Sequence, residues 1–398
     1  MTDHVPLTKR CIYCGQDKPE SEFSFEHIWP DSLGGDHLPA FWQTDEVCAR
    51  CNNVCGLFVD GAFIRSFAGM AERVADADRY QSLTNPRASP LAYTGRITAV
   101  PAPAGCVAEM WVGACGANMI HIRPRHDETW SGYVSGDPKA KKAAAGRVYI
   151  ALTSKEMFWV NVALKSFLAH FKRSERFLIN GAVQAAPGQR PIIATLDRNE
   201  TAPEELVVID AVLAAGRSGE VLKNELIVRT NPADRFLPKL GIALGYQLFG
   251  APYLDTQYAQ TLRRALWERD DAVRETLPVV GVGYFSSESR GLFGDILKWP
   301  AGWVLLIKRQ KEKLMLSVVT PSGRGMQGLI CNDPSLVAGL SPDHDEGTVW
   351  ITVPPLSQAV GPIGLPDYLA HKLGNATSPH LTALEGQLID PATLPACQ

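Results

Sequence analysis

No segment of this 398-residue sequence is long and apolar enough to cross a membrane, because such a span needs a run of about 18 apolar residues. The first residues, Met1-Thr2-Asp3-His4, also lack the basic and apolar regions of a signal peptide. An excess of positive charge is missing too, since 39 Lys and Arg face 42 Asp and Glu and the net charge is −3. These absences predict a cytoplasmic protein without a membrane partner, and bulk charge gives no sign of a polyanionic one.

Cysteine is too sparse for a disulfide scaffold, with nine residues in the whole chain. Four of the nine form two Cys-x-x-Cys pairs, and in a reducing compartment such pairs are better interpreted as metal ligands. The other five are scattered, and we expect them to be small buried or incidental residues: Cys55, Cys106, Cys115, Cys331 and Cys397.

Composition and turn signals predict an N-terminal module, a linker and a larger second domain. Residues 1–80 are rich in cysteine, glycine and acidic residues, with seven Lys or Arg against thirteen Asp or Glu. Residues 81–92 are rich in turn-forming residues and are typical of a linker. Residues 93–398 mix strand-like and helix-like patterns, which fits either one mixed α/β domain or two subdomains. The predicted fold class is therefore α+β.

Hydrophobic periodicity assigns several elements. Apolar residues at helical spacing predict a helix over about 49–77, and the run 206–212 has the pattern of a strand. A Pro near the start and a Gly after the end mark a strong helix over 231–249. The segments 303–308 and 314–319 predict a β-hairpin.

The residues that could carry chemistry lie between positions 11 and 53. Two Cys-x-x-Cys pairs bracket the dipeptide Glu26-His27, and Asn52 directly follows the last cysteine. Four thiolates in a closed tetrahedral site hold Zn²⁺ in a structural role, so chemistry would fall to the residues between the pairs. A neutral His can take a proton from water, and Glu and Asn oxygens are hard ligands that suit Mg²⁺ beside a phosphate group. The four cysteines are Cys11, Cys14, Cys48 and Cys51.

Three motifs together resemble those of the HNH endonuclease family, over about residues 8–70. They are the first cysteine pair, the run Glu-His-Ile-x-Pro-x-Ser-Leu-Gly-Gly over 26–35, and the run Cys-x-x-Cys-Asn-Asn-x-x-Gly over 48–56. The zinc-containing ββα-metal members of the family are the most similar. Their known fold implies an N-terminal module in which a β-hairpin carries His27 and a helix carries Asn52.

The resemblance also implies roles for these residues. His27 is expected to be the general base, Glu26 and Asn52 are expected to bind one catalytic Mg²⁺ or Mn²⁺, and the four cysteines are expected to bind structural zinc. Family members hydrolyse phosphodiester bonds and leave 5′-phosphate and 3′-hydroxyl ends.

Two positions depart from the family pattern. Glu26 stands where Asp is usual, and its side chain is one methylene longer. Many members carry a middle Asn that orients the His, and the nearest positions here are Thr44 and Asp45. Asn53 is an alternative to Asn52 as a metal ligand. Asp60, about two helical turns beyond Asn52, is either an additional site residue or a solvated helix residue.

The sequence thus predicts a metal-dependent DNA endonuclease that its C-terminal domain targets or regulates, through an activator ligand or a protein partner. This division of roles between the two domains follows from the acidic charge of the N-terminal module. Phosphate contacts need cations, which must come from the metal or from the larger domain. Analogy with other HNH proteins suggests antiviral defence, and cutting two strands with one site per chain favours a homodimer or hetero-complex. Two alternatives stay open: a non-catalytic zinc-ribbon module that binds nucleic acid or protein, and an RNA-directed nuclease.

Overall fold

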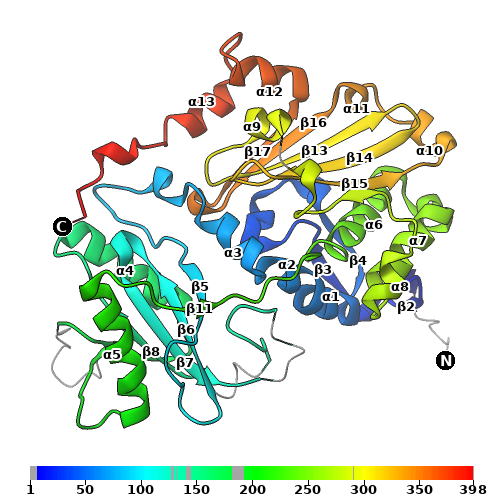
Figure 1. Ribbon diagram of the computed structural model, residues 1–398. Coiled ribbons are helices and arrows are strands. Elements are labelled where there is room, and N and C mark those ends of the chain that lie inside the picture. The colour runs from blue at the N-terminus through cyan, green and yellow to red at the C-terminus, as the bar shows by residue number, and fades with distance from the viewer. Residues whose placement is uncertain are drawn as a thin grey trace, which may run out of the picture. The chain divides into compact units, whose positions relative to one another are not determined.

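The computed structural model describes residues 7–126, 130, 132–139, 145–181, 192–289 and 291–397. They form two compact units, each assembled from separate parts of the chain (Figure 1). Unit 1 combines Met1–Ile64 with Thr230–Leu388, and unit 2 combines Arg65–Arg229 with Ile389–Gln398. The fold class is α+β, as predicted, but this division differs from the predicted boundaries at residues 80 and 93.

The N-terminal part of unit 1 is a ββα arrangement behind a small hairpin. Strands β1 (Thr8–Arg10) and β2 (Asp17–Pro19) form the hairpin. Strands β3 (Phe23–His27) and β4 (Gln43–Cys48) pair antiparallel, with a bulge between Ser24 and Glu26. Helix α1 (Ala49–Cys55) follows, and a π-helical turn leads into α2 (Gly61–Ile64).

The helix predicted over 49–77 is interrupted where the chain passes from unit 1 to unit 2. Helix α2 ends at Ile64, and α3 (Phe67–Val74) begins after Ser66. The Ser66 hydroxyl accepts a hydrogen bond from the Gly69 N–H at 3.0 Å and so caps the new helix. The helical spacing of apolar residues continues across this break. The sequence pattern alone therefore predicted one uninterrupted helix.

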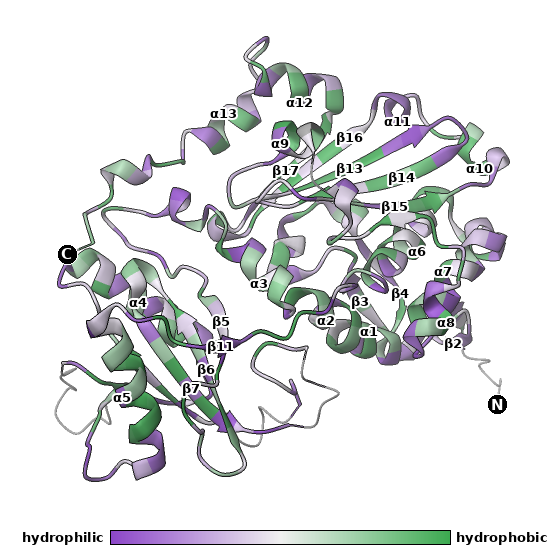
Figure 2. Ribbon diagram, viewed as in Figure 1, coloured by the Kyte–Doolittle hydropathy of each residue, from purple (hydrophilic) through white to green (hydrophobic). Residues whose placement is uncertain are grey.

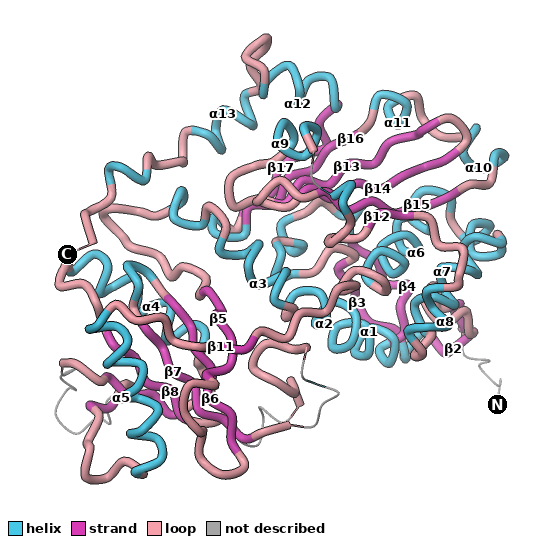
Figure 3. The backbone as a smooth tube through the Cα atoms, in the orientation of Figure 1, coloured by secondary structure: helices cyan, strands magenta, loops and turns pink. Residues whose placement is uncertain are grey.

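The C-terminal part of unit 1 is an antiparallel sheet in the order β12-β15-β14-β13-β16-β17 (Figure 3). The predicted hairpin is confirmed as β13 (Trp303–Gln310) and β14 (Lys313–Val319), and the predicted helix is confirmed as α6 (Phe236–Phe249). The other strands of this sheet are β12 (Gly281–Val282), β15 (Gly325–Cys331), β16 (Thr348–Val353) and β17 (Gln358–Gly364). Its other helices are α7 (Gln257–Trp267), α8 (Asp271–Glu275), α9 (Leu292–Leu297), α10 (Pro334–Ala338), α11 (Asp343–Glu346), α12 (Leu365–Lys372) and α13 (Pro379–Glu385).

An aromatic cluster joins the two parts of unit 1. Trp29 packs against Phe236 and Trp303, and Phe63 stacks on Phe236 with ring centroids 4.5 Å apart. All four side chains are almost completely buried. Burial of large aromatic side chains contributes strongly to stability, so the ββα segment shares its hydrophobic core with residues from the C-terminal part.

Hydrogen bonds between the same two parts of unit 1 add directional contacts. The Trp267 indole N–H donates to the Tyr13 carbonyl at 2.8 Å, and the Thr352 hydroxyl donates to the Leu33 carbonyl at 2.8 Å. Both acceptors lie in loops of the ββα segment, and the Leu33 carbonyl also accepts a hydrogen bond from the Trp29 indole N–H at 3.0 Å. The C-terminal part therefore supplies hydrogen-bond donors to backbone groups of the N-terminal part.

Unit 2 is built on a mixed sheet, which among the described residues has the order β10-β9-β8-β7-β6-β5-β11. Its strands are β5 (Ala92–Ile97), β6 (Cys106–Val112), β7 (Asn118–Pro124), β8 (Arg147–Ala151), β9 (Glu175–Leu178), β10 (Ala194–Thr195) and β11 (Asn224–Glu225). Residues of α4 (Met157–His170) and α5 (Pro203–Ser218) pack into separate hydrophobic clusters with alternating strand residues. The hydrophobic stretches of α5 and of the strands are green in Figure 2. Unit 2 therefore has a helix–sheet–helix architecture.

The strand predicted over 206–212 is wrong, because this run lies inside α5. Its β-branched residues favoured a strand, but Pro203 occupies the first turn together with acidic residues, which is typical of a helix start. Val208, Ile209 and Val212 are buried at helical spacing against the sheet. Packing on the sheet has overridden the local strand preference.

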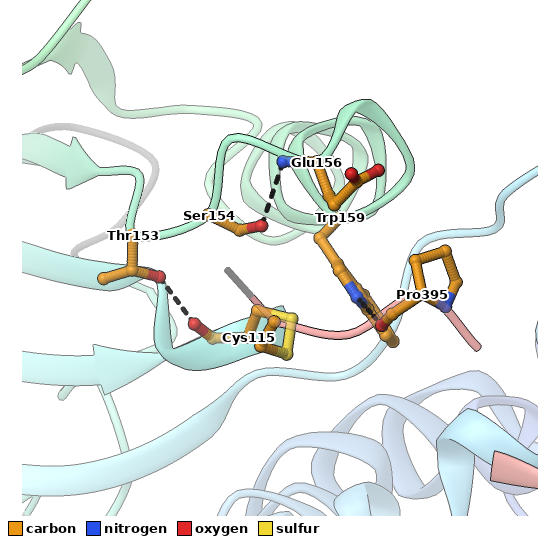
Figure 4. Close-up of a disulfide and its surroundings, with 7 residues drawn as sticks. Cys115, Thr153, Ser154, Glu156, Trp159 and Pro395 are labelled. Atoms are coloured by element: carbon orange, nitrogen blue, oxygen red, sulfur yellow. Dashed lines mark hydrogen bonds between the residues drawn. A yellow bond between two sulfur atoms is a disulfide. The ribbon is translucent and has the colours of Figure 1, made fainter. Parts of the chain in front are cut away.

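The end of the chain belongs to unit 2. The Ile389 N–H donates to the Arg79 carbonyl at 2.8 Å, and the Trp159 indole N–H donates to the Pro395 carbonyl at 2.7 Å (Figure 4). A disulfide joins Cys115, in the turn between β6 and β7, to Cys397. These two cysteines were expected to be incidental, and their pairing could not be seen from positions 282 residues apart.

Within the described ranges, no single helix has the length and apolar composition of a membrane span. The helical stretch Ala49–Ile64 and α3 meet those criteria only when counted together, and they are bent by 65° relative to each other.

Candidate active site and metal centre

The four paired cysteines meet in unit 1. Cys11 and Cys14 lie in the turn after β1, Cys48 ends β4, and Cys51 lies in the first turn of α1. Their sulfur atoms all lie within 4.8 Å of one another. Gly15 closes the first turn with φ +71°, and its N–H donates to the Cys11 carbonyl at 2.8 Å. A left-handed glycine lets both sulfurs of the pair face the same point.

The cluster fits one tetrahedral zinc ion. Zinc–sulfur bonds of about 2.3 Å place four thiolates about 3.8 Å apart, which agrees with the observed spacing. The Cys48 N–H donates to the Cys11 sulfur at 3.4 Å, and a hydrogen bond from the Cys51 thiol lowers the pKa of Cys11. Such contacts stabilise the thiolate form that zinc requires. A zinc ion held by all four cysteines would have no open coordination position and would serve the fold.

His27 lies at the end of β3, and its side chain is partly exposed. Its Nδ1 atom is 2.5 Å from the Asp31 carboxylate, in the short 3₁₀ turn that follows Pro30. Phe25 packs edge-on against the ring, with centroids 4.8 Å apart. The carboxylate favours the tautomer with the proton on Nδ1, which leaves Nε2 able to accept a proton.

Asp31 was not identified from the sequence, although it lies only four residues after His27. The positions compared with the orienting Asn of the family make other contacts. The Thr44 hydroxyl accepts from the Glu46 N–H at 3.2 Å, and Asp45 pairs with Lys9 at 3.3 Å. The orienting group on His27 is therefore a carboxylate that follows it in the chain.

Asn52 joins helix α1 to the strand that carries His27. Its side-chain nitrogen donates to the Phe25 carbonyl at 2.8 Å and to the Ser24 hydroxyl at 3.1 Å. Both hydrogen bonds use the amide nitrogen, so the amide oxygen can serve as a metal ligand. Asn53 is exposed and points elsewhere, because successive helical residues face different directions.

Glu26 is buried, unlike its neighbour His27, because successive residues of a strand point to opposite faces. Its carboxylate lies 2.7 Å from the Lys239 ammonium and accepts a hydrogen bond from the Tyr13 hydroxyl at 3.3 Å. The Asp60 carboxylate, in the turn after α1, lies 2.7 Å from the same ammonium. Glu26, Asp60 and Lys239 thus form a buried ion triad.

Lys239 belongs to α6 and is completely buried. Burial alone would lower the pKa of Lys239, but Asp60 and Glu26 raise it above its usual value. Burial also raises the pKa of Asp60 to about 6, while Lys239 opposes the rise. The ammonium is therefore the charge that makes burial of both carboxylates tolerable.

The sequence did not identify Lys239, which lies 179 residues beyond Asp60. A signal was present, because Lys239 is the one charged residue in the apolar run Phe236–Phe249. A lone Lys inside a buried helix needs a counter-charge, and the acidic N-terminal segment supplies two.

Comparison with known families matches residues 11–68 to the HNH endonuclease family. The matched segment contains both cysteine pairs, the His27–Asp31 pair and Asn52, so the resemblance of this segment is confirmed. Searches of curated proteins and of solved structures give no match.

Proposed function

We propose that this protein is a metal-dependent endonuclease that hydrolyses phosphodiester bonds in DNA, with His27 as the general base. The observation that carries the proposal is the His27–Asp31 contact within the segment matched to HNH endonucleases, where Asn52 is hydrogen-bonded to the strand that carries His27. With its Nδ1 proton held by Asp31, His27 can take a proton from water at Nε2 as the water attacks phosphorus. This role of Asp31 is analogous to that of a carboxylate that orients a catalytic His.

Asn52 is the residue best placed to hold a catalytic Mg²⁺ or Mn²⁺, through its amide oxygen. When bound, the ion would stabilise negative charge on the phosphate and on the leaving oxygen. The prediction that Glu26 is a second ligand requires its carboxylate to exchange Lys239 for the metal. We propose instead that Glu26 anchors β3, and that the partly exposed His27 is held in place by this buried contact.

The C-terminal part of unit 1 is the proposed support of the nuclease segment rather than an independent domain. Lys239 and the aromatic cluster both reach residues 1–64 from this part. Targeting by the remainder of the chain, antiviral defence and assembly into a homodimer or hetero-complex stay proposals. Phage challenge of cells that express wild-type or inactive protein, and light scattering of the pure protein, would test them.

A second candidate function is a non-catalytic zinc module that binds nucleic acid or protein. The ion pair between Glu26 and Lys239 favours it, because it occupies a carboxylate that family members use for metal. An RNA-directed nuclease shares the same chemistry and differs only in substrate.

Cleavage of supercoiled plasmid with Mg²⁺ or Mn²⁺ separates these functions. We expect His27→Ala to abolish cutting while zinc content and thermal stability stay unchanged. His37→Ala is the matched control, because His37 is also partly exposed beside an aspartate, at 3.2 Å from Asp36, and should leave cutting intact. Equal cutting by wild type and His27→Ala would contradict the proposal, and cutting of single-stranded RNA alone would move the substrate from DNA to RNA.

A further inference from the structure

Unit 1 contains a cavity of about 310 Å³ that lies apart from the cysteines and from His27. It is open to solvent on one side and is lined by the start of α6, by α7 and α8, and by the edge strand β12 beside β15. Its volume falls in the range of small-molecule sites. The aliphatic part of its lining, which we call the floor, includes Leu237, Leu262, Ala265 and Leu329.

One carboxylate in this cavity lacks a close partner. Asp234 is partly buried, and the nearest cation, the Arg274 Nε atom, is 3.9 Å away and beyond hydrogen-bond distance. Among the described residues, the ion pair with Arg274 is the contact that this carboxylate makes, and 29% of the Asp234 side chain is exposed. Burial raises the pKa of Asp234 to about 6; Arg274 opposes the rise, and Asp271 and Glu275 add to it.

The charged residues that line the cavity are Asp234, Glu275 and Arg274, so its net charge is negative. The terminal nitrogens of Arg274 donate to the Asp271 carboxylate at 2.6 Å and to the Glu268 carbonyl at 3.1 Å, and its Nε atom, which makes no hydrogen bond, is the one that faces Asp234. Glu275 also lines the cavity and accepts a hydrogen bond from Asn231. An apolar floor beside a carboxylate with one long ion-pair contact suits a ligand that has an apolar body and one positive charge.

We propose that this cavity binds a compact organic cation, an apolar body with one protonated amine facing Asp234, and that its occupancy regulates the nuclease. The regulatory part rests on the proposed nuclease function. Helix α6 supplies the connection, because Leu237 and Pro238 line the cavity and the next residue, Lys239, binds Glu26 and Asp60. A ligand that shifts the start of α6 therefore acts on the ammonium that anchors the strand of His27.

Binding can be tested on the full-length protein by titration calorimetry with 2-phenylethylamine, benzylamine and cyclohexylamine as probes. We expect saturable binding of at least one amine, and binding of phenylacetate, which has a similar body and the opposite charge, to be at least about tenfold weaker. Asp234→Asn, which removes the charge, and Ala265→Phe, which fills the floor, should each weaken amine binding by about tenfold or more. Absence of saturable amine binding, or equal binding by phenylacetate or by Asp234→Asn, overturns the site.

Regulation is tested by the initial rate of plasmid cleavage with and without a saturating amine. We expect the amine to change the rate of the wild type and not that of Asp234→Asn, whose rate without amine should equal that of the wild type. Binding without a change in rate overturns the regulatory part and leaves the site. A wild type that cuts no nucleic acid under any condition refutes the proposed function, and calorimetry still decides whether the cavity binds cations.

Discussion

Lys239→Met should destabilise unit 1 strongly, because one buried ammonium serves two buried carboxylates. Glu26 and Asp60 each lie 2.7 Å from the Lys239 Nζ atom and are only 5% and 8% exposed. Removal of one partner of a buried ion pair costs about 3–5 kcal/mol, because the remaining charge loses its compensation. With two carboxylates left unpaired, we expect a loss near the upper value, about 5 kcal/mol.

The sign of the pH dependence follows from the same geometry. Burial already raises the pKa of Asp60, and removal of the ammonium that opposes this rise leaves the Asp60 carboxyl with a folded pKa still further above its unfolded value. A carboxyl with a raised folded pKa stabilises the fold less as pH rises, so the loss in Lys239→Met should shrink as pH falls toward 4. Adding Glu26→Gln and Asp60→Asn to Lys239→Met should recover most of the lost free energy, since no buried charge then remains in the triad.

Urea denaturation followed by circular dichroism measures these differences. Lys372→Met is the matched control, because Lys372 is also largely buried in unit 1 but donates to the Lys298 carbonyl and lies over Trp299 instead of pairing with carboxylates. A loss in Lys239→Met of about 1 kcal/mol or less, or equal to that in Lys372→Met, would refute the reasoning that the ammonium compensates both carboxylates.

Three further predictions concern other contacts. Asp31→Asn should slow DNA cleavage by about tenfold to a hundredfold at unchanged zinc content, since the neutral amide stabilises protonated His27 less; an unchanged rate in a plasmid assay would remove Asp31 from the mechanism. Cys115→Ser should lower the free energy of unfolding by about 2–4 kcal/mol in oxidised protein, measured by urea denaturation, and an equal loss in reduced wild type would show that the disulfide is responsible. Amine affinity in the cavity should fall as pH drops through about 6, because Asp234 then takes up a proton, whereas a wild-type affinity that stays flat between pH 5 and 8 by calorimetry would contradict this assignment.

The cysteine cluster and the ββα segment could be predicted because their information is local. A Cys-x-x-Cys pair with a glycine turn brings two sulfurs together whatever surrounds it, and the second pair lies at the junction of β4 and α1. The motif around His27 likewise spans only ten residues, and the family match over residues 11–68 confirms the resemblance. The catalytic roles of His27, Glu26 and Asn52 stay predictions until cleavage is measured.

The rest could not be predicted because it depends on contacts between distant parts of the chain. Lys239 and the Cys115–Cys397 disulfide have no local pattern that points to their partners. The run within α5 shows the same limit in secondary structure, since its β-branched residues favour a strand until the sheet beneath it is known. Asp31 is different, because its spacing from His27 was available and its significance was not recognised.

Because the chain is synthesised from its N-terminus, the two carboxylates of the buried triad are made before the lysine that pairs with them. Asp60 leaves the ribosome 179 residues before Lys239, and most of unit 2 is made in between. At translation rates of about 5–20 residues per second, this interval lasts roughly 10–35 s. During it, Glu26 and Asp60 have no ammonium to pair with, so we expect nascent chains to hold an unfinished nuclease segment beside the nucleic acids of the translation machinery. The proposed nuclease centre would be completed only when about three fifths of the protein has been made, and a ribosome-arrested chain that ends before Lys239 should therefore be inactive.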